Sequence, residues 1–272
     1  VGFNLSALDI KVGSLAPSDT PWEDALVSLA NQWEEITDGE LEVKIYASGI
    51  AGDEADMLRK VRLGDRLQGA ALSGTGLNRI SSELLVMSLP FFFESYDELE
   101  YVMEETTPYF EDIVSKKGFK LVGWTTAGWV HFFGKQPIVT PEDLQNQKLA
   151  VSAEDEEILY TWRAMGFDAT PLHTTEVLTG LQTGMVEAFH TPPIVAAVYQ
   201  WFGVTPHMSN FQIAPLIAGF VVNGRTWRRV SDEHKDELLA VADEALKPLY
   251  SEVEKLEKEA IQIMKDNGLE IS

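Results

Sequence analysis

The stretch "LEVKIYASGIAGDEADMLRKVRLGDRLQGAALSGTG", Leu41–Gly76, carries the pattern that decides the fold. "LEVKIYAS" alternates apolar and polar residues and predicts a strand. "GDEADMLRKVRLG" has helical spacing, and Gly64 is placed to end that helix in the left-handed conformation. "LQGAALSGTG" predicts a second strand that runs into a glycine-rich loop. A strand, a helix and a strand in succession indicate an α/β fold with a mainly parallel sheet, whose functional edge lies at the carboxyl ends of the strands.

The alternation of strands and helices continues on both sides of this stretch. Upstream, "LDIKVGSLA" predicts a strand and "PSDTPWEDALVSLANQWEEITDGE" contains a helix. Downstream, "FKLVGWTTAG" and "WVHFFG" predict strands around a glycine, and "TPEDL" starts a helix in which Thr140 and Asp143 form a capping box. "KLAVSAEDEEILYTWRAMG" predicts a strand and a helix, and "FQIAPLIAGFVVNGRTW" a strand pair. Ser231 caps the next helix, and a long amphipathic helix runs from about Pro248 to Asn267.

One spacing occurs twice. Leucine, a second apolar residue and glycine stand three residues apart at Leu58–Gly64 and again at Leu178–Gly184, each time before a strand that runs into a loop. An internal duplication of one module explains the echo. The alternative is that a helix, a glycine and a strand follow one another in many α/β proteins.

The composition excludes several classes of protein. A chain of 272 residues, 45% of them hydrophobic, can bury the core of one large or two medium domains. Its 43 acidic residues outnumber the 21 basic ones, and a net charge of −22 disfavours nucleic acid as a partner. No apolar run reaches the roughly 18 to 20 residues of a transmembrane helix. The opening "VGFNLSALDI" lacks signal-peptide features, so a signal peptide either never existed or has been trimmed.

Residue patterns typical of catalysis and of cofactor binding are missing. None of the five histidines pairs with another His, Asp or Glu in H-E-x-x-H spacing, which predicts no metal site. "SGTGLNR" offers Gly74 and Gly76, but Arg79 replaces the third glycine of a dinucleotide-binding fingerprint. The chain has no cysteine and no G-x-S-x-G motif. We therefore predict no catalytic residue, no metal and no cofactor.

Bulky aromatic residues stand at or near predicted strand ends and loops, where ligand contacts concentrate in α/β folds. They are Trp22, Phe91, Phe92, Phe93, Trp124, Trp129, Phe189 and Trp201. For any one of them, core packing is the more frequent role. For the group, "LPFFF" and "GWTTAGWV" favour ligand contact, because they place rings beside proline and glycine breaks.

At these motifs the sequence resembles the solute-binding receptors of tripartite ATP-independent periplasmic (TRAP) transporters, the dicarboxylate-receptor-like family. The similar segments occur in the family's order and cover nearly the whole chain. They are "KVGSLAPSDTPWEDAL", the opening stretch, "LPFFFESYDELEYV", "KGFKLVGWTTAGWVHFF", "PIVTPEDLQNQKLAV", "LHTTEVLTGLQTGMVEAFHTPP" and the C-terminal helix.

The resemblance implies a two-lobed periplasmic-binding-protein-like fold with a long C-terminal helix spanning both lobes. We expect residues 1–125 with 212–247 in lobe I, 126–211 in lobe II, and 248–272 as the bracing helix. Such a receptor is exported to the periplasm, closes its lobes on a small molecule, and hands the molecule to a membrane permease.

The family's ligands are mostly organic acids, which arginines and an asparagine grip. In this sequence the corresponding positions hold Ala150, Val130 and Thr191. Neither alanine nor valine can donate the paired charged hydrogen bonds by which arginine binds a carboxylate. The departure implies a small hydrophobic or uncharged ligand, as in a variant group of these receptors that associates with a periplasmic tetratricopeptide-repeat protein.

The expected ligand contacts lie at strand ends of both modules. They are Thr20, Trp22, Ser73, Thr75, Phe91, Trp124, Val130, Ala150, Phe189, Thr191 and Trp201. Two alternatives stay open. The ligand could be a carboxylate gripped by Arg59, Arg79 or Arg163 instead, or the chain could be an enzyme or accessory protein on the same scaffold.

Overall fold

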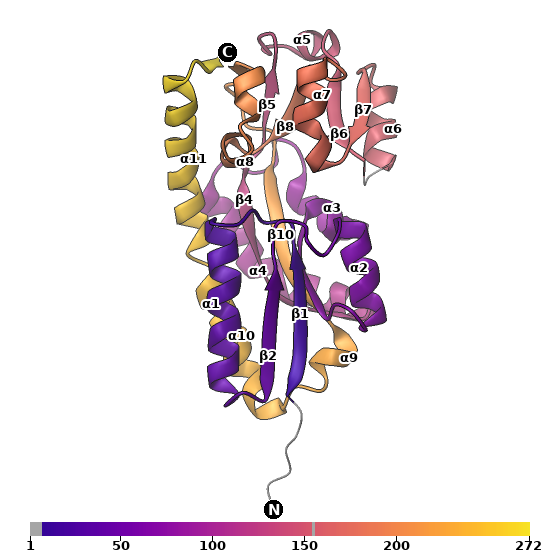
Figure 1. Ribbon diagram of the computed structural model, residues 1–272, viewed down its shortest axis with the longest axis vertical. Helices are drawn as coiled ribbons and strands as arrows, with labels where there is room; N and C mark the ends of the chain where they lie inside the picture. Colours follow the sequence, from indigo (N-terminus) through magenta and orange to yellow (C-terminus); the bar gives the residue numbers. More distant parts are fainter. Residues whose placement is uncertain (1–6, 154–155) are drawn as a thin grey trace, which may run out of the picture. The chain divides into compact units, whose positions relative to one another are not determined.

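The computed structural model describes residues 7–153 and 156–272, and the chain divides into two compact units (Figure 1). Unit 1 contains the chain up to Ser88, Glu94–Thr126 and Ile217–Glu252. Unit 2 contains Leu89–Phe93, Ala127–Leu216 and Val253–Ser272. The opening segment, on which the signal-peptide argument depends, lies in part outside the described residues.

Unit 1 is built on a five-stranded sheet in the order β2-β1-β3-β10-β4. Its strands are β1 (Leu8–Ser14), β2 (Leu41–Tyr46), β3 (Gly69–Ser73), β4 (Phe119–Trp129) and β10 (Pro215–Asn223), the last two of which continue into unit 2. Its helices are α1 (Pro21–Ile36), α2 (Glu54–Leu63), α3 (Gly74–Asn78), α4 (Tyr96–Lys116), α9 (Gly224–Trp227) and α10 (Asp232–Leu246), with a 3-10 turn over Ser82–Ser88. β1 is parallel to β2 and β3, whereas β10 is antiparallel to β3.

Unit 2 is built on a six-stranded sheet in the order β11-β9-β5-β8-β6-β7. The strands are β5 (His131–Gly134), β6 (Leu149–Ser152), β7 (Ala169–Leu172), β8 (Ala188–Thr191), β9 (His207–Met208) and β11 (Glu270–Ile271). The helices are α5 (Pro141–Gln145), α6 (Glu156–Ala164), α7 (Val177–Thr183), α8 (Pro193–Val198) and most of α11 (Leu249–Asp266), with 3-10 turns over Thr174–Glu176 and Trp201–Val204. β6 is parallel to β7 and β8, and β11 is parallel to β9, whereas β5 is antiparallel to β8 and β9. Both sheets therefore contain the expected parallel pairs together with antiparallel ones.

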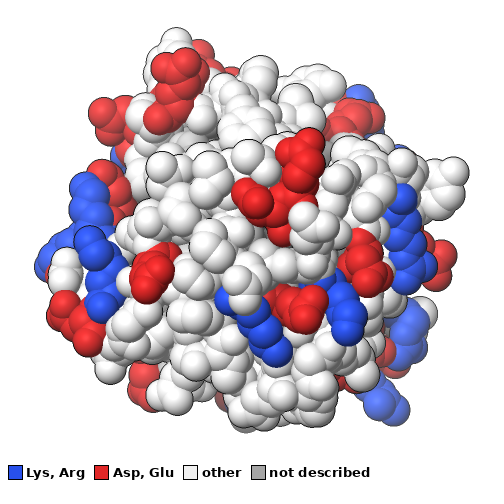
Figure 2. All heavy atoms as spheres, turned by 90° about the horizontal axis from the view of Figure 1, so that it is seen from above, with Lys and Arg blue, Asp and Glu red and all other residues white. Residues whose placement is uncertain are grey.

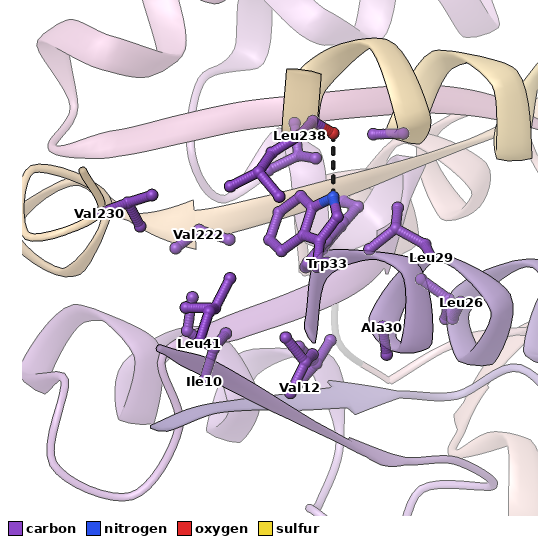
Figure 3. Close-up of a cluster of buried hydrophobic side chains, with 14 of the residues drawn as sticks. Ile10, Val12, Leu26, Leu29, Ala30, Trp33, Leu41, Val222, Val230 and Leu238 are labelled. Atoms are coloured by element: carbon purple, nitrogen blue, oxygen red, sulfur yellow. Dashed lines mark hydrogen bonds between the residues drawn. The ribbon is translucent and has the colours of Figure 1, made fainter. Parts of the chain in front are cut away.

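The core of unit 1 lies between α1, α10 and one face of the sheet (Figure 3). Trp33 of α1 is fully buried there among Ile10, Val12 and Val222. Its indole N–H donates to the carbonyl oxygen of Leu238 in α10 at 2.9 Å, the dashed line in Figure 3. This bond satisfies the polar edge of a large apolar side chain and fixes α1 against α10.

The opening stretch folds as its pattern predicts, apart from its end. β2, α2 and β3 follow in order, and Gly64 ends α2 with a φ of 74°. The expected glycine-rich loop is instead the short helix α3, which Ser73 caps by accepting the Thr75 N–H. A side chain at Gly76 would come within 2.9 Å of the Leu72 side chain, so this glycine provides close packing rather than loop freedom.

Two further expectations were wrong in detail. The strand pair expected in "FQIAPLIAGFVVNGRTW" is the single strand β10, because Asn223 then caps α9 by accepting the Arg225 and Thr226 N–H groups. The strand break expected at Gly128 falls instead at Val130. Gly128 stays inside β4 with a φ of 112°, where a Cβ would lie 2.5 Å from Glu257.

The other element boundaries predicted from capping residues are confirmed. Thr140 and Asp143 make the expected reciprocal capping box of α5. Asp232 is the first residue of α10, directly after Ser231, but the Ser231 hydroxyl makes no capping bond and donates to Glu233 Oε1 at 3.2 Å instead. α11 covers Leu249–Asp266, close to the expected ends of the C-terminal helix, and none of the described helices is long and apolar enough to span a bilayer.

Two glycines of unit 2 allow a matched test of whether a positive φ, rather than lack of space, requires glycine. Gly184 ends α7 with a φ of 75°, and no atom would crowd a Cβ there. Gly203 is equally open but has an ordinary negative φ. We expect Gly184→Ala to lower the free energy of unfolding in urea by about 1 kcal/mol, because only its backbone is strained. Gly203→Ala should leave it unchanged or raise it slightly. Equal losses in the two variants would contradict this account.

Candidate functional site

The carboxyl ends of β6 and β8 meet the start of β5 at one edge of the unit 2 sheet. His131 pairs with Thr191 in the antiparallel register of β5 and β8, so Val130 lies next to the last residue of β8. β6 is parallel to β8 and ends at Ser152. The sheet therefore places Val130 near Thr191, and it places Ala150 two residues before the end of the neighbouring strand.

One face of this sheet is packed core. Ala150 is 4% exposed and belongs to a cluster with Leu172 and Leu181. Phe189 stacks on Phe133 in the same cluster, with ring centroids 5.0 Å apart and planes 3° from parallel, and Trp201 meets Phe189 edge-on. Side chains alternate across a strand, so Phe189 and Trp201 serve first as core residues. The small Ala150 leaves room for their rings.

The opposite face carries His190 and Phe132 and is packed as well, since Phe132 is 8% exposed and belongs to a second cluster with Leu149 and Val151. His190 and Phe132 are paired across β8 and β5, with ring centroids 6.1 Å apart. Trp162 of α6 lies 5.9 Å from the His190 ring and 6.0 Å from that of Phe132. The His190 Nδ1 atom is buried and has no hydrogen-bond partner, although the residue as a whole is only half-buried.

Burial shifts the acid–base behaviour of two histidines at this edge. Desolvation lowers the pKa of His190 from 6.5 to about 4, since the charged imidazolium would lie against aromatic rings. Desolvation also lowers the pKa of His131, and the hydrogen bond between its Nδ1 and the Ser209 carbonyl opposes that shift only in part. Both imidazoles are therefore neutral at pH 7.

Val130 is flanked by a buried acidic side chain. Glu257 of α11 is 6% exposed and accepts the backbone N–H of Trp129 at 2.6 Å. The Val130 N–H donates to the carbonyl of Ala214, so the backbone on both sides of this bond is held in place. The position where acid-binding relatives are expected to carry an arginine thus has an aliphatic side chain, one residue after the N–H that Glu257 accepts.

In unit 1 three of the expected contact residues donate hydrogen bonds within the protein. The Trp22 indole N–H donates to the Thr126 carbonyl at 3.2 Å, and the Thr20 hydroxyl donates to the Pro17 carbonyl at 2.6 Å. The Trp124 indole N–H donates to the Thr107 hydroxyl at 2.9 Å. All three named donors are buried, and both indole N–H groups already have partners within the protein.

Ser73 and Thr75 lie at the carboxyl end of β3. The Ser73 hydroxyl donates to Glu54 Oε2 at 2.8 Å, and the Ser73 N–H donates to the other oxygen of the same carboxyl group. Glu54 is only 2% exposed although it opens α2. It orients Ser73, whereas Thr75 is half-buried in the first turn of α3.

Phe91 differs from the other expected contacts because it is 68% exposed. Its φ is 58°, a left-handed conformation that is unusual for a bulky residue. The Phe91 N–H donates to the Ile213 carbonyl at 2.7 Å, and its ring lies 6.4 Å from Phe211. The backbone of this short segment is thus tied to unit 2 while its ring faces outward.

Sequence patterns did not identify Glu54, Glu257 and His190 as part of these groups. The Glu54 and Glu257 carboxyl groups are buried by long-range contacts, which a single sequence does not reveal. His190 could have been identified from the sequence, because a histidine inside the short apolar strand "AFHT" faces one side of a sheet. Among residues 7–153 and 156–272, no three His, Asp or Glu side chains gather as they would around a metal ion.

Residues 12–272 match the family of bacterial extracellular solute-binding proteins, family 7. The chain belongs to this family. A solute-binding protein of Chromohalobacter salexigens is 27% identical over 94% of this chain and 75% of its own length. The sialic acid-binding periplasmic protein SiaP of Vibrio cholerae is 23% identical over 98% of this chain and 83% of its own.

Solved structures confirm the two-lobed α/β fold. The TRAP periplasmic solute-binding protein of Sulfitobacter sp. with bound β-D-galacturonate has a TM-score of 0.90 at 23% identity, covering 97% of this chain and 88% of its own. That of Chromohalobacter salexigens with bound D-glucuronate has a TM-score of 0.89 at 25% identity, covering 96% and 87%. The members of the family and the proteins in these structures are solute-binding receptors, not enzymes. The predicted receptor role is therefore confirmed, and the alternative of an enzyme is wrong.

The low pKa of His190 makes a test of its surroundings possible. Between pH 6.5 and about 4 the unfolded chain binds a proton at this residue and the folded chain does not, so its contribution to stability falls as the pH falls. At pH 5 the loss relative to pH 7.5 is on the order of 2 kcal/mol.

We expect His190→Phe to remove this component. The difference in unfolding free energy between the variant and the natural protein, measured in urea at several pH values, should grow in the variant's favour below pH 6.5. Comparing the two proteins cancels the titration of the many carboxylates. A difference that does not change with pH would show that the His190 ring is solvated.

Proposed function

We propose that this chain is the extracytoplasmic receptor of a TRAP-type transporter and that its ligand is a small, uncharged and largely apolar molecule. The receptor works in the periplasm and delivers the ligand to a membrane permease. The observation that carries the ligand class is the set of side chains at the three acid-gripping positions. They are aliphatic or short, namely Val130, Ala150 and Thr191.

The surroundings of these positions support an uncharged ligand. A carboxylate at Val130 would approach Glu257, and the two acidic groups would repel each other where little water reaches them. Ala150 is enclosed by apolar core, where an unpaired charge costs several kcal/mol. The relatives with galacturonate or glucuronate bound are 23% and 25% identical to this chain, so they support the fold more than the ligand.

The three arginines considered as alternative carboxylate-binding residues make other contacts or lie on the surface. Arg59 is exposed on α2 and pairs with Asp56. The Nε–H group of Arg163 donates to the Ala169 carbonyl at 3.0 Å, within unit 2. Arg79 is exposed, and its carbonyl accepts from Arg62. None of the three is a buried guanidinium held ready for a carboxylate.

The remaining contact residues belong to the same proposal. Each unit contributes part of the ligand surface at its strand ends. Unit 1 contributes Thr20, Trp22, Ser73, Thr75 and Trp124, and unit 2 contributes Phe91, Val130, Ala150, Phe189, Thr191 and Trp201. Phe189 and Trp201 are core residues, so they support the ligand-contacting side chains rather than contact the ligand over a large area. A tetratricopeptide-repeat partner also stays a prediction, supported by the resemblance alone.

The ligand class can be tested with a matched pair of sugars, D-glucuronate and its uncharged amide, and with native mass spectrometry of gently purified receptor. We expect no heat of binding for D-glucuronate at millimolar concentration, and a retained uncharged molecule in the mass spectrum. A micromolar Kd for D-glucuronate would refute the proposal. A retained carboxylic acid would refute it as well.

A variant that introduces a positive charge tests the same idea from the other side. Val130→Arg places a guanidinium at a half-buried strand edge, where it can also pair with Glu257. We expect the retained ligand to be lost while thermal unfolding changes little. Ala150→Arg is unsuitable for this purpose, because a buried charge among Phe133 and Leu172 would unfold the core. Val130→Leu, which adds bulk without charge, is the control and should keep the ligand.

A further inference from the structure

Arginine is unevenly distributed along this acidic chain. Seven of its eight arginines lie in two segments of unit 1, residues 59–79 and 225–229, although the whole chain has 43 acidic residues and only 21 basic ones. The two segments meet, because the Arg225 guanidinium donates to the carbonyls of Arg62 and Leu63 at 3.0 and 3.2 Å. Figure 1 shows α9, which contains Arg225, close to the end of α2.

The turn after α4 adjoins the same surface. The Gly224 N–H donates to the Gly118 carbonyl at 2.9 Å, so Lys117 lies near the start of α9. The guanidinium carbon of Arg62 lies 5.7 Å from the centroid of the Phe119 ring. We call this surface the basic patch. Its members are Arg59, Lys60, Arg62, Arg66, Arg79, Lys117, Arg225 and Arg228, all exposed except the half-buried Lys60.

Most of the basic patch is not neutralised by the protein's own acids. Arg59 and Lys60 share the carboxyl group of Asp56. Five other members make no ion pair with any residue that the structure describes; they are Arg62, Arg66, Lys117, Arg225 and Arg228. Acidic partners are abundant in a chain with 43 acids and 21 bases, so five exposed cations without one are available to a group outside the chain.

Two of these guanidinium groups are held in place by the backbone. Arg225 donates to carbonyls at the end of α2, and Arg62 donates to the Arg79 carbonyl at 3.1 Å. The Asn223 side-chain amide donates to a further α2 carbonyl, that of Val61, at 2.7 Å. Carbonyls at the end of a helix carry partial negative charge, so these bonds neutralise the part of α2 that would repel an anion. The remaining N–H groups of each guanidinium stay available as donors.

The basic patch contains a hollow of about 250 Å³. The residues that line it are Arg59, Lys60, Leu63, Asp65 and Arg66. The Asp65 carboxyl group already accepts the Arg66 backbone N–H at 2.8 Å. Three basic groups outweigh Asp65 and also Asp56, which pairs with Arg59 and Lys60, so the surroundings of the hollow are positive. A carboxylate side chain of another molecule fits such a space in both size and charge.

The basic patch lies at the edge of the unit 1 sheet opposite to Ser73 and Thr75, two of the expected ligand contacts. Phe119 starts β4, and Gly69, three residues after Arg66, starts β3. β3 then runs away from the patch and ends at Ser73. A partner bound to the patch therefore leaves the carboxyl end of β3 uncovered.

We propose that the basic patch is a docking surface for an acidic segment of a partner protein, whose Asp and Glu side chains pair with Arg62, Arg66 and Arg228. Guanidinium groups bind carboxylates through two parallel charged hydrogen bonds. Eight basic residues from three segments of the chain are more than one small anion can contact, whereas an extended acidic segment can pair with several of them. This inference goes beyond the proposed function, because it names a surface and a partner rather than the transported ligand.

The net charge of −22 favours a short acidic segment over a larger polyanion. A membrane leaflet or a nucleic acid presents a continuous array of phosphates, which would also face the acidic side chains on the rest of the surface. A short segment contacts the basic patch alone. At physiological ionic strength the Debye length is about 8 Å, so the patch attracts such a segment while more distant acids are largely screened.

The test uses a fluorescein-labelled peptide of alternating glutamate and serine, and a reference peptide with glutamine in place of glutamate. Each is titrated with the intact receptor at physiological salt, and binding is followed by fluorescence anisotropy. We expect the acidic peptide to bind about tenfold or more tightly than the reference peptide, with an affinity that falls as salt is added. Equal binding of the two peptides, or no binding of the acidic one, would overturn the inference.

The double variant Arg66→Gln with Arg228→Gln removes two exposed, unpaired charges of the patch, so the melting temperature should not change. We expect it to weaken binding of the acidic peptide about tenfold. Lys258→Gln with Lys265→Gln is the matched control, since it changes the net charge by the same amount on α11 in unit 2. The control should change the affinity less than about twofold. Equal loss in both double variants would show that net charge alone acts, and would overturn the inference.

Two other occupants are tested with the same double variant. Binding to vesicles that contain phosphatidylglycerol, if Arg66→Gln with Arg228→Gln abolishes it, would assign the basic patch to a lipid surface and overturn the inference. Self-association in sedimentation measurements, if the same variant abolishes it, would assign the patch to a second copy of this chain and overturn the inference as well. The D-glucuronate titration tests the proposed function alone, so failure of one idea is distinguishable from failure of the other.

Discussion

The antiparallel register of β5 against β8 decides what each side chain of unit 2 can do. Pairing Phe132 with His190 and Phe133 with Phe189 sends one pair to each face of the sheet. The second pair stacks in the core with Ala150 and Trp201, and Phe132 of the first pair packs on the other face with Leu149 and Val151. A slip of one residue would exchange the two faces, so the register is fixed because Phe132 and Phe189 each pack in a separate apolar cluster.

This register also explains why some site residues could be predicted from the sequence and others could not. Val130 and Thr191 lie at strand ends, and strand ends can be predicted from alternation and breaks. Whether Phe189 or His190 faces the core depends on which neighbouring strand pairs with β8, and that information is not local. Helix boundaries were predictable for the opposite reason, since caps such as Gly64 and Thr140 act within a few residues. Gly76 and Gly128 are closely approached by Leu72 and Glu257, respectively. These contacts are not evident from the local sequence, so the pattern predicted a loop at Gly76 and a strand break at Gly128.

The charges of the surface and those of the interior have different roles. Figure 2 shows Asp and Glu side chains together with Lys and Arg on one face, among a larger uncharged area. Many of the ion pairs are exposed contacts between residues three or four apart on one helix, as in Lys258 with Glu254 and Lys116 with Asp112. Such pairs contribute little to stability. The buried acids Glu54 and Glu257 matter more, because each accepts backbone N–H groups at a strand end and so fixes the backbone there.

Glu257 links the shape of the backbone to the choice of ligand. Its carboxyl group lies where a side chain at residue 128 would crowd it, since a Cβ on Gly128 would be 2.5 Å from Glu257 Oε1. Once in place, it holds the N–H of Trp129 and presents an acidic group beside residue 130. An arginine at 130 would be drawn to this carboxyl group instead of to a ligand, and a ligand carboxylate would be repelled by it. Valine at 130, glycine at 128 and glutamate at 257 thus fit the proposal that the ligand is not bound through a carboxylate at this place.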